Sequence, residues 1–257
     1  MYWTSCATDI GTKKQINQDS LLLQKAVTGE GEVLLAVVAD GVGGWKKGEL
    51  ASNTAVHHLK EWFEGKLPQM LQEKGNTQAI LESAKECVLE VDRKLKEYAN
   101  ENGEPIGTTI ALLFLYQHHF FVIHVGDSRV YGCDSMETVQ LTRDHTWVQQ
   151  QVEQGKMTNE QAACSEQKNI LTQCLGGRLP VLPECKEGVI AETTTFLICS
   201  DGFYNIYTEN EMQTYLQKMN QCSREEFQEL PVRMIQEIKE RGEKDNISVV
   251  VVRAIHK

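Results

Sequence analysis

Aspartates stand at the ends of several short apolar segments in this chain. Asp40, Asp127 and Asp201 each follow a run of residues typical of a buried β-strand, whereas Asp245 shortly precedes such a run and Asp19 opens one. Carboxylates held rigidly at one end of a sheet, partly out of water, repel one another strongly. Divalent cations relieve that repulsion, and oxygen ligands without a cysteine or histidine cluster favour Mg²⁺ or Mn²⁺ over Zn²⁺.

Turn formation is the simpler explanation for any one of these sites, because Asp-Gly is a common turn sequence. The recurrence of aspartate at five such positions favours a metal site instead. A covalent aspartyl-phosphate route is disfavoured, because that chemistry needs an Asp-x-Asp pair and Val42 and Phe203 occupy the second position after Asp40 and Asp201. The glycine-rich loop after Asp40 also lacks the Gly-Lys-Ser/Thr sequence of a nucleotide-binding P-loop.

The segments that must position these aspartates are short strands and amphipathic helices. We expect strands at 21–23, 33–39, 109–116, 120–125, 129–132, 195–199 and 247–252. Apolar spacing predicts helices over 51–63 and 80–98, and two capping boxes begin further helices at Thr208 and Ser223. Pro231 is expected to kink or shorten the last helix. A hairpin at Gln117-His118 indicates antiparallel pairing, and two packed sheets with paired helices outside would bury every apolar stripe.

Composition limits the classes of protein that the chain can belong to. The 257 residues carry 26 basic and 36 acidic side chains, a formal net charge of −10, which disfavours nucleic acid and anionic membranes as partners. The eight cysteines form no C-x-x-C pair, so we expect free thiols and a cytoplasmic protein. The longest apolar runs have seven residues, whereas a membrane span needs about 20. We predict one domain over residues 1–257 and a monomer.

Seven short motifs occur in a fixed order along residues 17–248. They are Asn17-Gln18-Asp19-Ser20, Ala39-Asp40-Gly41-Val42-Gly43-Gly44, Gly107-Thr108-Thr109, Val125-Gly126-Asp127-Ser128-Arg129, Leu141-Thr142-Arg143-Asp144-His145, Cys199-Ser200-Asp201-Gly202 and Lys244-Asp245-Asn246-Ile247-Ser248. Together they resemble the protein phosphatase 2C family of metal-dependent Ser/Thr phosphatases, in its minimal bacterial form. The resemblance implies an α+β fold: a four-layer αββα sandwich with two central antiparallel β-sheets and the metal site at one end. It also implies a flap beside that site, at residues 147–190.

The resemblance assigns metal-binding roles to the aspartates. Asp40 would bridge two tightly bound Mn²⁺ or Mg²⁺ ions, with the Gly41 carbonyl on one of them and Asp201 and Asp245 on the other. A hydroxide between the cations would then attack the phosphorus of phosphoserine or phosphothreonine. Asp19 would orient metal-bound water from the outer shell.

Two further residues have less certain roles in this resemblance. Asp127, with Asp201, resembles the site of a weaker third metal. Lys14 stands where many members have an arginine that grips the substrate phosphate, and lysine keeps the charge but loses the bidentate fork. A solvated surface lysine beside Lys13 is the alternative for Lys14.

The leading hypothesis is therefore a phosphoprotein phosphatase that acts on phosphorylated proteins and opposes a bacterial Ser/Thr kinase. One alternative is a pseudophosphatase that binds a partner, and the presence of Asp40, Asp201 and Asp245 argues against it. Another is a different metal hydrolase such as a phosphodiesterase, which the ordered motifs do not fit. The sequence does not identify the substrate, the kinase or the pathway.

Overall fold

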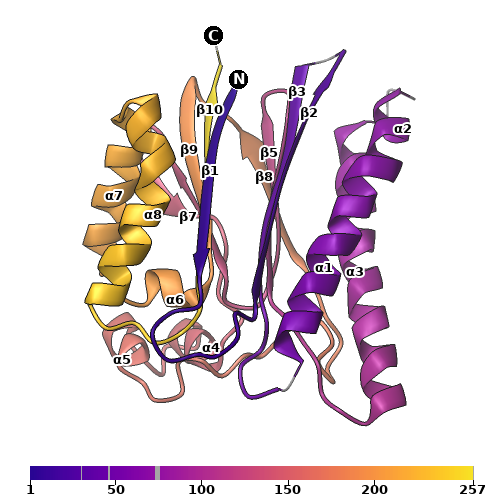
Figure 1. The fold of residues 1–257 in the computed structure, drawn as a ribbon, viewed down its shortest axis with the longest axis vertical. Helices are drawn as coiled ribbons and strands as arrows, with labels where there is room; N and C mark the ends of the chain where they lie inside the picture. Colours follow the sequence, from indigo (N-terminus) through magenta and orange to yellow (C-terminus); the bar gives the residue numbers. More distant parts are fainter. Residues whose placement is uncertain (30, 46, 73–75, 257) are drawn as a thin grey trace.

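The computed structural model describes residues 1–29, 31–45, 47–72 and 76–256, and its centre is a pair of five-stranded antiparallel sheets (Figure 1). The first sheet has the order β1-β10-β9-β6-β7, with strands Tyr2–Asp9, Ile247–Ile255, Thr193–Cys199, Arg129–Cys133 and Thr138–Gln140. The second has the order β2-β3-β4-β5-β8, with strands Asp19–Thr28, Gly31–Asp40, Ile110–Tyr116, His119–Val125 and Glu184–Val189.

Helices cover the outer face of each sheet, so the molecule has four layers (Figure 1). The described helices are α1 (Gly48–Glu61), the π-helix η1 (Trp62–Lys66), α2 (Leu67–Gln72), α3 (Thr77–Asn102), α4 (Trp147–Glu153), α5 (Asn159–Ala163), α6 (Asp201–Tyr204), α7 (Glu209–Gln221) and α8 (Arg224–Glu240). Helices α1 and α3 lie on the second sheet, and α7 and α8 lie on the first. The α+β sandwich predicted from the sequence is confirmed.

Three apolar clusters hold these layers together. One lies between the sheets and includes Leu34, Val38 and Phe196, all fully buried. The other two lie between each sheet and its own helices, with Leu59 and Ile80 in one and Leu216 in the other. Burial of each such side chain contributes roughly 1.5–3 kcal/mol, so the packed layers form a rigid frame for the strand ends.

Local sequence signals explain several of the element boundaries. The β4–β5 hairpin turns at Gln117, which has a positive φ of 54°. Thr208 and Ser223 each form the expected capping box, at the starts of α7 and α8. Helix α8, however, runs through Pro231 to Glu240, so the expectation that this proline would shorten the helix was wrong, whereas a kink at Pro231 stays a prediction. Pro231 is buried in the face that packs on the first sheet, and this packing offsets the missing backbone hydrogen bond.

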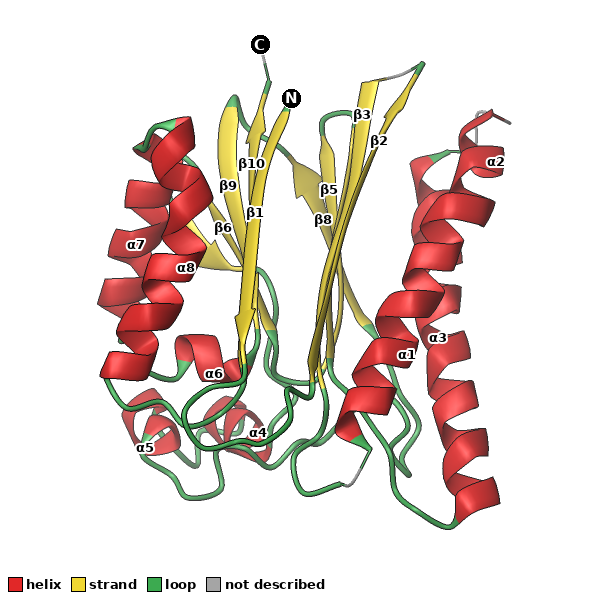
Figure 2. Ribbon diagram, viewed as in Figure 1, coloured by secondary structure: helices red, strands yellow, loops and turns green. Residues whose placement is uncertain are grey.

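Loops and the short helices α4, α5 and α6 gather at one end of the sheets, opposite the two termini (Figure 2). Strands β3, β5 and β9 end there, and β2 and β10 begin there, so the five aspartates share this end. Within the described ranges, no helix combines the length and apolar character that crossing a membrane would require. All eight cysteines are free thiols.

Candidate active site

Four of the predicted aspartates line one cavity of about 340 Å³ at the loop-rich end of the sheets. They are Asp40, Asp127, Asp201 and Asp245, and the cavity wall also includes Lys14, Gly41 to Gly44, Thr109, Asn169 and Leu171. The fifth aspartate, Asp19, is buried beside this cavity, in register with Asp40 across β2 and β3. The structure therefore brings together every residue that the sequence assigned to the site.

The backbone around Asp40 is fixed by hydrogen bonds from the neighbouring strand. The Asp40 amide donates to Thr109 Oγ1 at 3.0 Å, and its carbonyl accepts from the Thr109 amide at 2.8 Å. The Gly41 amide donates to the Gln18 carbonyl at 3.1 Å. A Cβ atom on Gly41 would lie 2.4 Å from the carbonyl carbon of Gly48, so only glycine permits this approach of the loop to α1.

The loop that carries Asp245 is held by its neighbour Asn246. The Asn246 side chain accepts from the Gln18 amide at 2.9 Å and donates to the carbonyls of Ile10 and Ile16. It thus ties the segment before β10 to the loop that contains Lys14. Gly202 makes close backbone contact here, because a Cβ on it would lie 2.1 Å from the Asn246 carbonyl oxygen.

Burial and mutual repulsion raise the pKa values of the clustered carboxyl groups. Burial first, and then the charge of Asp245, raise the pKa of Asp201 to about 7. Burial raises the pKa of Asp19 to about 6, although hydrogen bonds including one from Ser200 Oγ partly offset this. Burial and neighbouring aspartates hold the pKa values of Asp40 and Asp127 well above their usual range.

This donor set fits divalent cations. All its side chains offer oxygen atoms, the ligand type of Mg²⁺ and Mn²⁺. The raised pKa values indicate that ionising several of these carboxylates at once is unfavourable unless positive charge lies nearby. Asp19 Oδ1 is also buried and lacks a hydrogen-bond partner among the described residues. A cation or its water would satisfy that atom and stabilise the ionised cluster.

Lys14 lies at the cavity wall and forms an ion pair with one of the predicted ligands. Its Nζ is 2.7 Å from Asp245 Oδ1, and about a third of each side chain is exposed. Burial alone would lower the pKa of Lys14, but the hydrogen bond and charge of Asp245 outweigh it and raise that pKa. The ammonium therefore stays protonated beside the carboxylates.

A second group with metal-ligand chemistry lies outside this cavity. Ligand atoms of His124, His145 and Glu184 lie within 4.8 Å of one another. His145 Nδ1, however, accepts from the Gly126 amide at 3.1 Å, so Nε2 carries the proton and faces Glu184 Oε2 at 3.4 Å. In this tautomer His145 has no free lone pair for a cation. The hydrogen bond from the Gly126 amide therefore explains the position of the His145 ring, which holds the backbone next to Asp127.

Several residues that support the site were not singled out from the sequence. Thr109 Oγ1 accepts a hydrogen bond from the Asp40 amide, and Ser200 Oγ donates one to Asp19 Oδ2. Asn246 holds the loop that contains Lys14, through its bond to the Ile10 carbonyl. Each lies within one of the seven motifs, and Ser200 and Asn246 adjoin an aspartate, so membership of a motif was the available signal. Asn169 and Leu171, by contrast, come from the 147–190 segment, which the resemblance placed beside the site without singling out either residue.

Comparison with known proteins gives the same class as the fold and the site. The family model described as protein phosphatase 2C matches residues 10–239. The chain is 31% identical over 221 residues to the serine/threonine phosphatase stp of Listeria monocytogenes, which covers 85% of this chain and 83% of that protein. The chain therefore belongs to the protein phosphatase 2C family, and it is a hydrolase of the metal-dependent protein phosphatase class.

Solved structures support this assignment along the whole chain. The serine/threonine phosphatase of S. agalactiae has a TM-score of 0.83 at 28% identity, with both chains covered completely. The catalytic domain of the serine/threonine protein phosphatase PstP in complex with two manganese ions has a TM-score of 0.80 at 25% identity, with 99% of each chain covered. The family and enzyme class expected from the motifs are thus confirmed.

Proposed function

We propose that this protein hydrolyses phosphoserine and phosphothreonine in proteins, using Mn²⁺ or Mg²⁺ held by the aspartates of the cavity. The observation that carries the proposal is the convergence of Asp40, Asp127, Asp201 and Asp245 on one cavity that Lys14 also lines. When bound, such cations supply an activated water molecule and neutralise charge on the phosphoryl oxygens. The names of the Listeria and S. agalactiae relatives support the Ser/Thr substrate class.

The residues divide this work among them in the proposal. Asp40 and the Gly41 carbonyl, with Asp201 and Asp245, hold two cations tightly, and Asp127 with Asp201 supports a weaker third. Asp19 orients water from behind the cavity. Ser200 Oγ donates a hydrogen bond of 2.9 Å to Asp19 Oδ2, which leaves Asp19 Oδ1 available for the water. Lys14 binds and orients the phosphoryl group of the substrate with its ammonium charge.

We propose a cytoplasmic monomer that opposes a Ser/Thr kinase, with residues 1–257 as one catalytic domain. The segment 147–190 acts as a flap in this proposal, because it contributes Asn169 and Leu171 to the cavity wall. Nucleic acid and membranes are not among the proposed partners.

A phosphopeptide assay tests the central proposal. The purified protein should release phosphate from phosphoserine and phosphothreonine peptides with Mn²⁺ or Mg²⁺, and chelator should abolish the release. A phosphodiester substrate should be hydrolysed far more slowly. Binding of Mn²⁺ without hydrolysis of any phosphopeptide would favour the pseudophosphatase alternative.

A further inference from the structure

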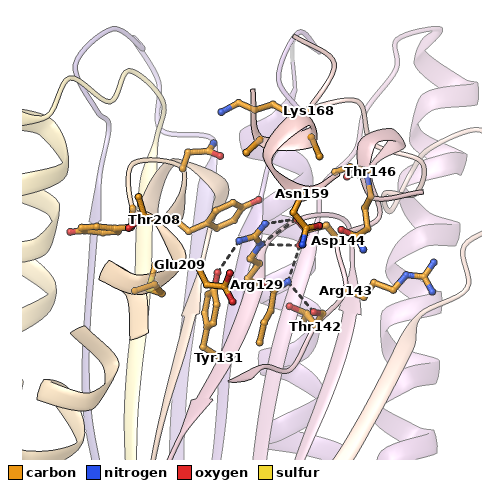
Figure 3. Close-up of a pocket in the computed structure, with 18 of the residues that line it drawn as sticks. Arg129, Tyr131, Thr142, Arg143, Asp144, Thr146, Asn159, Lys168, Thr208 and Glu209 are labelled. Atoms are coloured by element: carbon orange, nitrogen blue, oxygen red, sulfur yellow. Dashed lines mark hydrogen bonds and ion pairs between the residues drawn. The ribbon is translucent and has the colours of Figure 1, made fainter. Parts of the chain in front are cut away.

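A second groove, of about 550 Å³, is drawn in Figure 3. Asn169 lines both this groove and the catalytic cavity, so both hollows border the 147–190 segment at this residue. Its walls come from α4 and α5 on one side and from the start of α7 on the other, and Arg129 lies between them.

The charge of Arg129 is already satisfied by its neighbours. Its guanidinium makes a bidentate ion pair with Asp144, with contacts of 2.6–3.2 Å, and donates to Tyr131 Oη at 2.9 Å. It also stacks on the ring of Tyr204 at 3.7 Å. Because these contacts use its donors and its planar face, Arg129 forms a rigid floor and is not a second phosphate site.

Two groove residues close to Arg129 are hydrogen-bonded to predicted metal ligands. Tyr204 Oη donates to the Asp127 carbonyl at 3.0 Å, and the Asn205 amide reaches Asp201 Oδ2 at 3.4 Å. Both Tyr204 and Asn205 line the groove. A ligand in the groove is therefore held at a fixed position relative to the catalytic aspartates.

The walls carry mainly amide and hydroxyl side chains, together with two charges that have no ion-pair partner in the described part of the chain. Asn159, Gln149 and Gln213 offer both donors and acceptors, which suits the backbone of an extended peptide. Lys168 and Glu209 are the two unpaired charges, and Figure 3 draws them on different sides of Arg129. A groove that is polar and open in this way does not suit an apolar ligand.

We propose that this groove binds the polypeptide segment next to the phosphorylated residue of the substrate, and this proposal rests on the proposed phosphatase function. Lys168 precedes Asn169, which lines both hollows, so Lys168 favours an acidic side chain close to the phosphorylated residue. Glu209 favours a basic side chain farther along the segment. The groove thereby distinguishes phosphoproteins from small phosphate esters.

The test compares a phosphopeptide carrying these charges with para-nitrophenyl phosphate, which is too small to reach the groove. Lys168→Ala and Glu209→Gln should each lower the ratio of phosphopeptide to ester kcat/KM about three- to fivefold, mainly through KM, as expected for exposed charge pairs. Ala163→Trp fills the groove from the end of α5 and should lower the same ratio at least about tenfold. Replacing the charged residues of the peptide by neutral ones should remove the effects of the two charge variants.

Matched controls come from equivalent positions outside the groove. Lys156→Ala changes a lysine of the same segment, and Glu225→Gln changes an acidic residue in the first turn of α8, as Glu209 is in α7. Both should leave the ratio unchanged. Equal losses on both substrates, or no change in the ratio for the charge variants, would overturn the groove proposal even if Ala163→Trp fails to fold. A parent protein that hydrolyses neither substrate would instead overturn the proposed function.

Discussion

Lys14 shows how a side chain next to a carboxylate cluster acquires a specific role. Its neighbour Lys13 does not line the cavity, whereas Lys14 does and pairs with Asp245. In the proposed function a cation shares the charge of Asp245, which would hold the Lys14 ammonium less strongly and leave it available to a phosphoryl group. Lys14 thus differs from Lys13 in its position, and the variants described next distinguish a phosphate-binding lysine from a surface lysine.

Lys14→Ala should lower kcat/KM for a phosphopeptide mainly through KM, because a flexible point charge binds ground and transition states alike. A charge-assisted contact is worth about 1.5–3 kcal/mol, or roughly 10- to 150-fold. Since Lys14 is about one third exposed, solvent screening favours the lower end of that range. Lys14→Arg should restore the loss.

The control for this prediction is Lys13→Ala, measured on the same phosphopeptide. It should change kcat/KM by less than about twofold. Equal, small effects of Lys13→Ala and Lys14→Ala would remove the phosphate role of Lys14. Added salt should weaken binding more in the parent than in Lys14→Ala, because only the parent has that charge to screen.

Residue types and motif order were enough to predict that the aspartates would gather at one end of the sheets, because carboxylates at strand ends have a recognisable pattern. They were not enough to predict Asn169 or Leu171. These two reach the cavity through the path of an irregular segment, and that path depends on tertiary contacts such as the Leu175 amide donating to the Thr108 carbonyl at 2.9 Å. Short-range sequence patterns do not encode such contacts.

At the scale of elements, the loop between β3 and α1 provides a sharp contrast between two glycines. Gly41→Ala would place a Cβ 2.4 Å from the Gly48 backbone, so the loop and α1 must move apart. We expect clear losses of both thermal stability and phosphatase activity. Gly43→Ala, two residues later, places its Cβ in open space and should preserve both. Similar melting temperatures and activities for the two variants would show that the loop tolerates displacement.

The sequence predicted strongly apolar elements better than exposed ones. Strands β3, β4 and β10 are buried along most of their length and were recognised. Strand β8 was missed because it is an edge strand whose residues Glu184–Val189 are almost all exposed, so it has no apolar pattern. Strand β1 was missed because only Tyr2 and Ser5 are buried in it, and its place depends on pairing with β10, far away in the chain.

At the scale of the whole molecule, the carboxylate cluster couples folding to pH and to cations. Between about pH 7 and 8 the unfolded aspartates are fully ionised, whereas folded Asp201, with a pKa of about 7, still binds part of a proton, and burial beside other aspartates also raises the pKa values of Asp40 and Asp127. The folded state thus binds more protons, so stability falls as pH rises through this window. His124, whose pKa burial lowers to about 3, and His145 and His256, whose pKa values burial also lowers, oppose this trend near pH 6.5, where unfolded histidines are half protonated, and their effect fades as the pH rises above 7.

The melting temperature of the chelator-treated protein should therefore fall from pH 7 to pH 8. The increase in melting temperature caused by Mn²⁺ should grow over the same range, because fewer protons compete with the cation. Asp201→Asn should flatten both trends. A melting temperature of the metal-free protein that rises across this window would contradict the repulsion that we infer among the aspartates.

The most direct test of the account is the turnover of Asp40→Asn on a phosphopeptide at saturating Mn²⁺, with metal binding measured by calorimetry on the same sample. Asp40 stands at the end of β3, opposite Asp19 and on the wall of the cavity, and we propose that it is the ligand shared by both tightly bound cations. We predict weaker Mn²⁺ binding and a loss of turnover of at least about two orders of magnitude, in a variant that stays folded. Near-normal turnover in Asp40→Asn would contradict the account.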